Sequence, residues 1–412
     1  MPNKYGKDDE KTGAQKTGAI VVGGGPAGLT AAITLAAGGI ATILVGKRPA
    51  RPDNRTTALM TGSVTALETL GVWPLCEAQA APLKIMRIVD DTGRLWRAPE
   101  VKFSADEIDL DAFGHNIENR RLVAALEQHA RTFPNLRLIE DDVVSVEPSD
   151  EAVTVTLKSG DALRAPLAIG ADGRRSLCRE AAGIGIDTRD YQQVALTVCL
   201  KHSRPHRDTS TEFHTPSGPF TLVPLPGQRS SLVWVLAPHQ ADEIAELDDA
   251  ALSAEIERAS HSILGKIEIE PGRGLFPLGV VTARRFGDKR IALIGEAAHV
   301  IPPIGAQGLN LGLRDAATIG ELAIAAHHEG KDIGGAGVLA AYDKMRRTDV
   351  GSRTLAIDLL NRTLLTDLLP VQGLRGVGLY LLDRIGPLRR AAMREGIAPA
   401  ANQPRLMRGE AL

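Results

Sequence analysis

A glycine cluster near the N-terminus has the spacing of a dinucleotide-binding turn. Gly23, Gly25 and Gly28 form the pattern GxGxxG between a run of β-forming residues at 19–22 and a small-residue segment at 29–37. In such a unit the first glycine permits a tight turn, the second lets the backbone approach a pyrophosphate, and the third allows close helix packing. The spacing therefore predicts strand, turn and helix around a dinucleotide, the alternative being a glycine-rich turn of some other α/β domain.

The second strand of this unit lacks the acid that usually binds the adenosine ribose. The apolar run at 40–45 ends at Gly46, where an Asp or Glu is expected. One lost hydrogen bond is worth roughly 0.5–1.5 kcal/mol, so binding should be weakened about three- to tenfold rather than abolished. Gly46→Glu should then tighten binding if the backbone there accommodates a side chain.

Two later segments also place a turn after a short apolar run. Residues 167–170 lead into GADGRRS, which contains Asp172, and residues 290–294 lead into GEAAHVIPPIGAQGLN, which contains Glu296. Because ligand sites of α/β sheets lie at the carboxyl ends of the strands, we expect the three turns to meet at one sheet edge.

The last of these segments has the composition of a loop that can hold an anionic ring edge. Pro302 and Pro303 stiffen it, Gly305 and Gly308 permit close backbone approach, and a helix expected from Leu309 points its N-terminus at the loop. His299 invites a catalytic role, but in a loop that enters a helix a structural hydrogen bond is the preferred interpretation.

The three motifs, in this order and at these separations, resemble the signatures of flavin-dependent aromatic hydroxylases of the para-hydroxybenzoate hydroxylase fold. RTTAL at 55–59, ENRRL at 118–122 and VGLYLLDRIGPLRRAAMREG at 377–396 resemble the branch that hydroxylates polyprenylated phenols in ubiquinone biosynthesis. The resemblance covers nearly the whole chain. It implies bound FAD, NAD(P)H as a visiting co-substrate, O2, and a phenolic, polyprenylated small molecule as substrate.

The resemblance also implies roles for individual residues. The first motif would bind the pyrophosphate, the segment containing Asp172 would serve both FAD and the nicotinamide nucleotide, and Glu296, where the family usually has Asp, would bind the ribityl chain. The implied cofactor-binding residues are Gly23, Gly25, Gly28, Arg55, Arg120, Asp172, Glu296, Gly308, Leu309 and Asn310, and Pro303 and Gly308 would line the flavin. On spacing alone, Arg55 and Arg120 could equally be helix-cap or surface arginines. No general base is assignable, and no metal is implied.

The chemistry implied by the resemblance is carried by the cofactor. Reduced flavin and O2 give a flavin hydroperoxide, whose distal oxygen an electron-rich phenol attacks. The protein would position the rings, exclude water and favour the phenolate, so neither a metal nor a nucleophilic triad is needed. Two alternatives share these motifs: a flavin-dependent reductase of a prenyl chain, and a non-catalytic flavoprotein subunit of an assembly.

The order of the motifs predicts an α/β fold with a discontinuous, Rossmann-like FAD-binding domain. That domain is expected over 17–75, 100–182 and 284–350, an antiparallel β-sheet substrate domain over 76–99 and 183–283, and a C-terminal helical region over 351–412. Within the substrate domain the pattern predicts strands at 194–202, 220–224 and 230–236, a hairpin at 88–96 and one acidic helix at 242–262.

Composition narrows the functional classes. The chain has 412 residues, 43% of them hydrophobic, and a net charge of −2 with 3% aromatics, which gives no reason to expect nucleic-acid binding. The three cysteines, Cys76, Cys178 and Cys199, have no disulfide or zinc spacing, which favours a reducing cytoplasm, and Cys178 is interpreted as a buried, inert thiol. Glycines break the uncharged run at 17–46, which argues against a membrane span.

The C-terminal region is basic. Residues 371–412 contain seven arginines and three acids, and apolar residues recur at helical spacing from 374 to 388. A helix over 371–390 could contact the inner face of the membrane peripherally, or could close the protein's own core. The resemblance also implies partner proteins of ubiquinone biosynthesis, which could deliver the substrate if the membrane does not.

Overall fold

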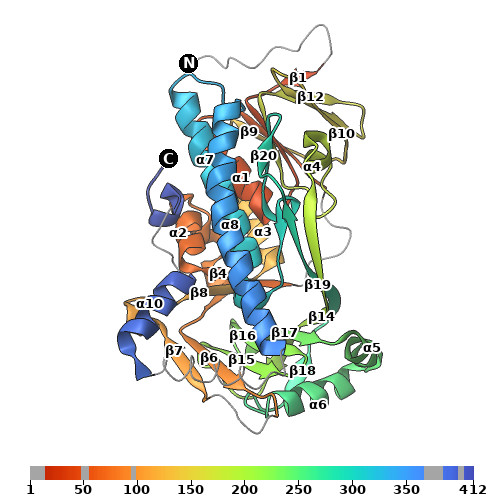
Figure 1. Cartoon of the computed structure of the whole chain (residues 1–412), viewed down its shortest axis with the longest axis vertical. Coiled ribbons are helices and arrows are strands. Elements are labelled where there is room, and N and C mark those ends of the chain that lie inside the picture. Colours follow the sequence, from red (N-terminus) through yellow and green to blue (C-terminus); the bar gives the residue numbers. More distant parts are fainter. Residues whose placement is uncertain (1–13, 48–54, 94–98, 366–383, 398–402) are drawn as a thin grey trace.

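The computed structural model describes residues 14–47, 55–93, 99–365, 384–397 and 403–412. A six-stranded sheet and a nine-stranded sheet lie toward opposite ends of the long axis (Figure 1). The long helix α8, Ala336–Leu365, runs along this axis between them. The predicted α/β class is confirmed.

The six-stranded sheet is the Rossmann-like element predicted from the motifs. Its order is β20-β21-β13-β2-β3-β9, and all neighbours are parallel except β20. The strands are β2 (Ala19–Val22), β3 (Thr42–Val45), β9 (Leu136–Ile139), β13 (Leu167–Gly170), β20 (Gly287–Asp288) and β21 (Ile291–Leu293). β2, β3, β13 and β21 are buried at every position, as parallel strands covered on both faces require.

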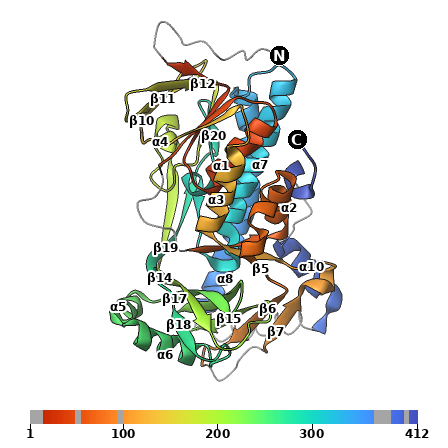
Figure 2. The same cartoon turned by 180° about the vertical axis from the view of Figure 1, so that it is seen from behind.

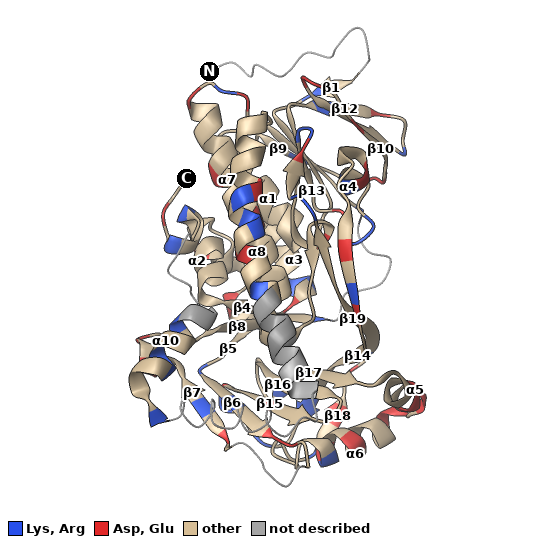
Figure 3. Ribbon diagram, viewed as in Figure 1, with Lys and Arg blue, Asp and Glu red and all other residues tan. Residues whose placement is uncertain are grey.

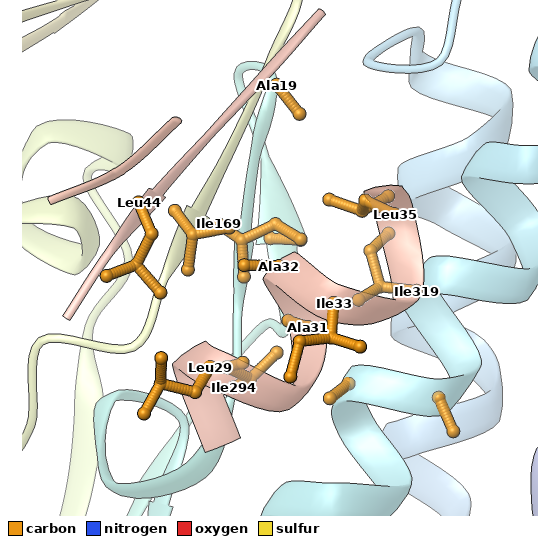
Figure 4. Packing of buried hydrophobic residues seen from close by; sticks show 14 of the residues in the cluster. Ala19, Leu29, Ala31, Ala32, Ile33, Leu35, Leu44, Ile169, Ile294 and Ile319 are labelled. Atoms are coloured by element: carbon orange, nitrogen blue, oxygen red, sulfur yellow. The ribbon is translucent and has the colours of Figure 1, made fainter. Parts of the chain in front are cut away.

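Helices α1 (Pro26–Ala37), α3 (Asn119–Ala130) and α7 (Gln307–His328) pack together beside this sheet. Figure 4 shows α1 lying between the sheet, represented by Leu44 and Ile169, and α7, represented by Ile319. Alanines and glycines along α1 and α7 let the helices approach closely. A four-stranded sheet of β1 (Gln15–Lys16), β12 (Ala162–Ala165), β11 (Val153–Leu157) and β10 (Val143–Pro148) lies at the same end of the molecule.

The nine-stranded sheet follows the order β22-β19-β14-β17-β16-β15-β6-β7, with β18 paired to β14. It contains the predicted strands within β14 (Ile186–His202), β16 (Gly218–Leu225) and β17 (Arg229–Leu236). The others are β6 (Ile85–Asp90), β7 (Val101–Ser104), β15 (Thr209–Thr215), β18 (Ile267–Ile269), β19 (Gly274–Ala283) and β22 (His299–Val300). It is antiparallel except where β15 pairs with β6.

Two local predictions for this part of the chain need correction. The hairpin predicted at 88–96 is formed by β6 with β7, so its second strand starts at 101; residues 94–98 lie outside the described part of the chain. The single helix predicted at 242–262 is two helices, α5 (Pro238–Glu246) and α6 (Asp249–Ala259). Asp248 ends the continuity because its carboxylate accepts a hydrogen bond from the Ala251 N–H and caps α6.

A three-stranded sheet lies between the two larger ones. It consists of β4 (Thr56–Met60), β8 (Gly114–Glu118) and β5 (Ala80–Pro82). The remaining helical segments are α2 (Thr61–Thr69), α4 (Leu177–Ala182), α10 (Gly386–Ile397) and the short 3-10 helices η1 (Trp73–Leu75), η2 (Glu77–Gln79), η3 (Ala105–Ile108), η4 (Gly295–Ala297), η5 (Ile304–Ala306) and η6 (Arg405–Arg408). In the described residues no helix has both the length and the apolar character needed to span a bilayer.

The basic C-terminal region is only partly available to an external surface. Arg389 of α10 is buried, forms an ion pair with Glu107, and lies 4.5 Å above the Phe103 ring, measured from Cζ to the ring centroid. Leu406 and Met407 of η6 join the main hydrophobic core. Most of the helix predicted over 371–390 lies outside the described residues, and α10 begins at Gly386. Arg389, one of the seven arginines of this region, therefore stabilises the fold and adds no charge to the surface.

Candidate FAD site

The three glycine-rich turns follow three adjacent parallel strands. The first motif follows β2, the second follows β13 and the third follows β21, and these strands are neighbours in the sheet. The turns touch one another: the Ala171 N–H donates to the Val22 carbonyl over 2.7 Å, and a Cβ built at Gly23 would lie 2.1 Å from the Ala171 carbonyl oxygen. The predicted convergence at one sheet edge is present.

The glycines of the first motif differ in what surrounds them. Gly23 has φ +120°, a conformation that favours glycine, and a Cβ at Gly28 would lie 2.0 Å from the Gly23 carbonyl oxygen. At Gly25 a Cβ would meet no protein atom within 4 Å. Gly23 and Gly28 are thus required by the turn itself, whereas Gly25 leaves an open backbone surface.

Helix α1 begins at this open surface with unsatisfied donors. Gly25 is its N-cap, Pro26 its first residue, and no side chain caps it. The first-turn N–H groups and the positive end of the helix dipole are therefore available to an anion such as a pyrophosphate.

The third motif offers a second open backbone surface. Gly305 and Gly308 have no protein atom within 4 Å of a built Cβ, and α7 starts at Gln307 without a side-chain cap. Helices α1 and α7 pack side by side. The two uncapped helix starts and the open glycines form a cradle that fits a pyrophosphate at one end and an anionic ring edge at the other.

Comparison with known proteins identifies the family. Residues 16–356 match the family model described as "FAD binding domain". A curated relative, "Ubiquinone hydroxylase UbiL" of Rhodospirillum rubrum, is 35% identical over 95% of this chain and 92% of its own. The "3-demethoxyubiquinol 3-hydroxylase" of Escherichia coli is 31% identical over 92% of this chain and 98% of its own. This chain belongs to the FAD-dependent monooxygenases.

A solved structure supports the same fold. The p-nitrophenol 4-monooxygenase PnpA of Pseudomonas putida DLL-E4 superposes with a TM-score of 0.75 at 20% identity, covering 92% of this chain and 97% of the other. Because residues 16–356 match the "FAD binding domain" family, the cofactor of this flavoprotein is FAD, and the residues of the open cradle between α1 and α7 fit it.

Two of the polar residues expected at the FAD have their side chains in structural hydrogen bonds. The Asp172 carboxylate accepts from the Ser176 hydroxyl over 2.6 Å and from the Cys178 N–H over 3.1 Å, which caps α4. The Asn310 side chain joins α7 to β4 and α2 through the Met60 N–H, the Ser63 hydroxyl and the Ala58 carbonyl. A contact of Asn310 with flavin would have to use its backbone.

The contacts of the remaining expected residues do not test their roles at FAD. Arg55 is exposed and lies 5.6 Å from the centroid of the Phe276 ring, Arg120 forms an ion pair with Glu118 over 2.7 Å, and the Glu296 carboxylate is exposed in η4. Pro303 is exposed next to the open glycines. Their roles at FAD stay predictions.

The reason for glycine at position 46 is steric. A Cβ there would lie 2.3 Å from the Gly24 nitrogen and 2.7 Å from its Cα, so the second strand leaves no room for a side chain beside the fingerprint turn. Gly46→Glu should tighten FAD binding only if the backbone accommodates a side chain at position 46, and this condition is not met.

Gly46→Ala should weaken FAD binding and lower the melting temperature. Because the added methyl group must displace the Gly23–Gly24 backbone, we expect a cost of about 1–3 kcal/mol in stability. Differential scanning fluorimetry and FAD titration of the apo-protein measure both effects. Tighter FAD binding by Gly46→Ala or Gly46→Glu would show that the turn moves to admit a side chain.

A buried ion-pair network that sequence reasoning missed supports the third motif. Asp315 of α7 accepts from the Gly295 N–H over 2.9 Å, lies 2.6 Å from His299 Nε2 and accepts from Arg346 Nε of α8 over 2.6 Å. This confirms the structural interpretation of His299. Burial alone would raise the pKa of Asp315, but His299 and Arg346 hold that pKa below its ordinary value.

The network continues along α8 to the second end of the loop 295–307, which we call the flavin loop. Arg346 also contacts Asp349, which pairs with Arg353, and Arg353 donates to the Gln307 side chain at the start of α7 over 3.0 Å. Figure 3 shows basic and acidic segments following one another along α8. Helix α8 thus holds both ends of the loop 295–307. The adjacent charged residues Arg314 and Asp315, in the middle of a mostly apolar stretch of α7, were the available sequence signal.

Cys178 is buried, as predicted, and the other two cysteines are buried as well. Burial raises the pKa of Cys76 and of Cys199 to about 11 and that of Cys178 well above its ordinary value. In the described residues, Cys199 lies with Glu118 and Glu270 in a group close enough to hold a metal ion. Arg229 already pairs with both carboxylates, at 2.7 Å from Glu270 and 3.3 Å from Glu118.

Proposed function

We propose that the protein is an NAD(P)H-dependent flavoprotein hydroxylase that inserts one oxygen atom of O2 into the ring of a polyprenylated phenol on the way to ubiquinone. The observation that carries the proposal is the FAD cradle formed by three turns on adjacent strands, in a chain whose curated relatives are named as ubiquinone hydroxylases. The names of these relatives support a quinone precursor as substrate.

Bound FAD would supply the redox chemistry, taking electrons from the nicotinamide nucleotide and activating O2. The chain's own residues would bind and orient it: Gly25 would admit the pyrophosphate and the start of α7 would hold the ring edge, while α8 fixes the loop between Gly295 and Gln307. We also propose that the domain division predicted from the sequence applies, with the nine-stranded sheet contributing the substrate-binding surface.

The test is turnover of the FAD-loaded chain with NAD(P)H, ¹⁸O₂ and short-chain prenylphenols. Mass spectrometry should find one ¹⁸O in a ring hydroxyl of the product. A product with a saturated prenyl chain and no ¹⁸O would instead identify a reductase, and absence of NAD(P)H oxidation with every phenol would favour a non-catalytic flavoprotein subunit.

We further propose that α10 contacts the membrane surface peripherally, which would bring the site to a lipid-soluble substrate. Ile385 and Leu388 are 43% and 46% exposed and lie next to Arg390, an arrangement typical of interfacial helices. Partner proteins of ubiquinone biosynthesis are the other expected source of substrate.

Arg390→Gln should weaken binding to anionic liposomes about fivefold, because one arginine near an anionic surface is worth about 1 kcal/mol. Co-sedimentation at rising salt measures this, and binding should fall as the charges are screened. Arg258→Gln, on exposed α6, is the control. Unchanged binding by Arg390→Gln, or equal binding to neutral vesicles, would assign α10 a purely structural role.

A further inference from the structure

The two faces of the nine-stranded sheet are packed differently. On the outer face, Phe220, Leu222 and Trp234 are buried in one cluster with residues of α5 and α6. Figure 2 shows these two helices beside the strands of the sheet. The residues between them in sequence point to the opposite, inner face. Of these, Thr221 and Val233 remain half-buried although they belong to central strands. Among the described residues, side chains therefore do not fully cover the inner face, which leaves open space beside it.

This space lies beside the flavin end of the cradle. Strand β4 crosses the inner face, where the Thr56 hydroxyl donates to the Ser231 hydroxyl over 2.8 Å. Two residues further along, the Ala58 carbonyl accepts from the side chain of Asn310, which belongs to the flavin-loop motif. Helix α8 also reaches β16. Strand β4 thus contacts both the nine-stranded sheet and the start of α7.

Glu212 lies on the inner face, in the row of the half-buried residues. The strand register pairs it with Thr221, which in turn pairs with Val233. One Glu212 carboxylate oxygen lies 2.8 Å from His214 Nε2, and the other accepts from the Thr221 hydroxyl over 3.3 Å. The Glu212 side chain is 24% exposed, whereas His214 is 7% exposed. Each carboxylate oxygen retains a lone pair for a further donor.

We propose that Glu212 is the general base of the hydroxylation, accepting the proton of the substrate's phenolic hydroxyl. The proposal rests on the proposed function. A carboxylate held by two neighbours and reachable from the open space is positioned to accept a hydrogen bond from a phenol that lies between the sheet and the flavin. His214 is a positioning residue that fixes the carboxylate.

The proton transfer balances with the ring chemistry. As the ring carbon bonds to one oxygen atom of O2, the bond between the two oxygen atoms breaks, and the second oxygen atom keeps the electron pair and leaves as water, with electrons that reduced FAD would supply. The phenolic O–H becomes strongly acidic in this step. Its bond breaks, the proton goes to a Glu212 oxygen, and the electron pair forms a carbonyl on the ring. The attacked carbon then loses its hydrogen as a proton to solvent, the ring regains aromaticity, and the carbonyl oxygen takes a proton back from Glu212.

The test isolates the hydroxylation step in the full FAD-loaded chain. Enzyme reduced anaerobically with dithionite is mixed with O2 and a short-chain prenylphenol, and hydroxylated product and H2O2 are quantified in one turnover. Glu212→Gln should slow product formation about 100-fold and release H2O2 instead, while FAD content, flavin reduction by NAD(P)H and melting temperature stay at wild-type values. Glu212→Asp should recover part of the rate, and formate should partly rescue Glu212→Ala.

Glu268→Gln is the matched control, because Glu268 is an exposed glutamate of β18 in the same sheet. A Glu212→Gln rate within a few-fold of wild type would overturn the proposal while leaving the hydroxylase function in place. Parallel losses of melting temperature, FAD and rate that formate does not rescue would make Glu212 structural, which also overturns it. If the wild-type enzyme itself forms no hydroxylated product, the proposed function fails, and the role of Glu212 fails with it.

Discussion

Replacing Gly25 with valine should weaken FAD binding roughly 10- to 100-fold and lower the melting temperature of the apo-protein only slightly, through the less favourable N-cap of α1. A Cβ at this position meets no protein atom within 4 Å, so the fold can accommodate the side chain. The side chain would, however, occupy the space of the pyrophosphate, which must approach the backbone at the start of α1. Overpacking of this kind costs about 1–3 kcal/mol, and the steric conflict arises only in the complex with FAD, so it makes the free energy of FAD binding less favourable.

Titration of the apo-protein with FAD, followed by flavin fluorescence, measures the affinity, and calorimetry measures the melting temperature. Gly28→Ala is the informative contrast: its Cβ would lie 2.0 Å from the Gly23 carbonyl oxygen, so both affinity and stability should fall. Gly337→Val, at an open glycine of α8 outside the motifs, controls for the valine itself. Wild-type FAD affinity in Gly25→Val would mean that the pyrophosphate binds elsewhere.

Arg346→Met should lower the free energy of unfolding by about 3–5 kcal/mol, because it leaves the fully buried Asp315 carboxylate without its guanidinium partner. Chemical denaturation measures the loss. Since Asp315 also accepts from the Gly295 N–H, FAD should dissociate faster from the variant. Adding Asp315→Asn should recover part of the stability, because the uncompensated charge is then removed.

Arg347→Met is the matched control one residue away. Arg347 is 59% exposed and pairs with Asp343 on the surface of α8, so its loss should cost less than about 1 kcal/mol. Equal losses for the two variants would show that the buried network contributes no more than a surface ion pair.

The same network predicts how stability depends on pH. The pKa of Asp315 is lowered in the folded protein, so its contribution is present above the ordinary aspartate pKa and is lost as pH falls through the folded-state pKa. Wild type should therefore lose more stability on acidification than the Arg346→Met, Asp315→Asn double variant.

Local signals were sufficient for much of the fold and for part of the site. The strands and the helix of the first motif were predicted within a few residues, since apolar runs and glycine spacing act over short stretches of chain. The sequence also showed that Gly46 is not the usual acid, but only the structure shows the 2.3 Å approach to the Gly24 nitrogen that excludes a side chain. The prediction of a single helix at 242–262 was wrong because Asp248, within the acidic pattern, caps the start of a second helix.

By itself, the sequence determined that three turns follow three strands and that a dinucleotide fits them, because spacing fixes turn and helix geometry locally. Tertiary structure alone decided which charged residues meet. Asp315 pairs with Arg346. Arg389, in the basic C-terminal region, forms an ion pair with Glu107, 282 residues away in sequence. It also decided that Glu212 faces the open side of the sheet. Side chains alternate along a strand, so the sequence assigns them to two opposite faces. Which face stays open depends on the pairing with distant strands and on the packing of α5 and α6 against one face.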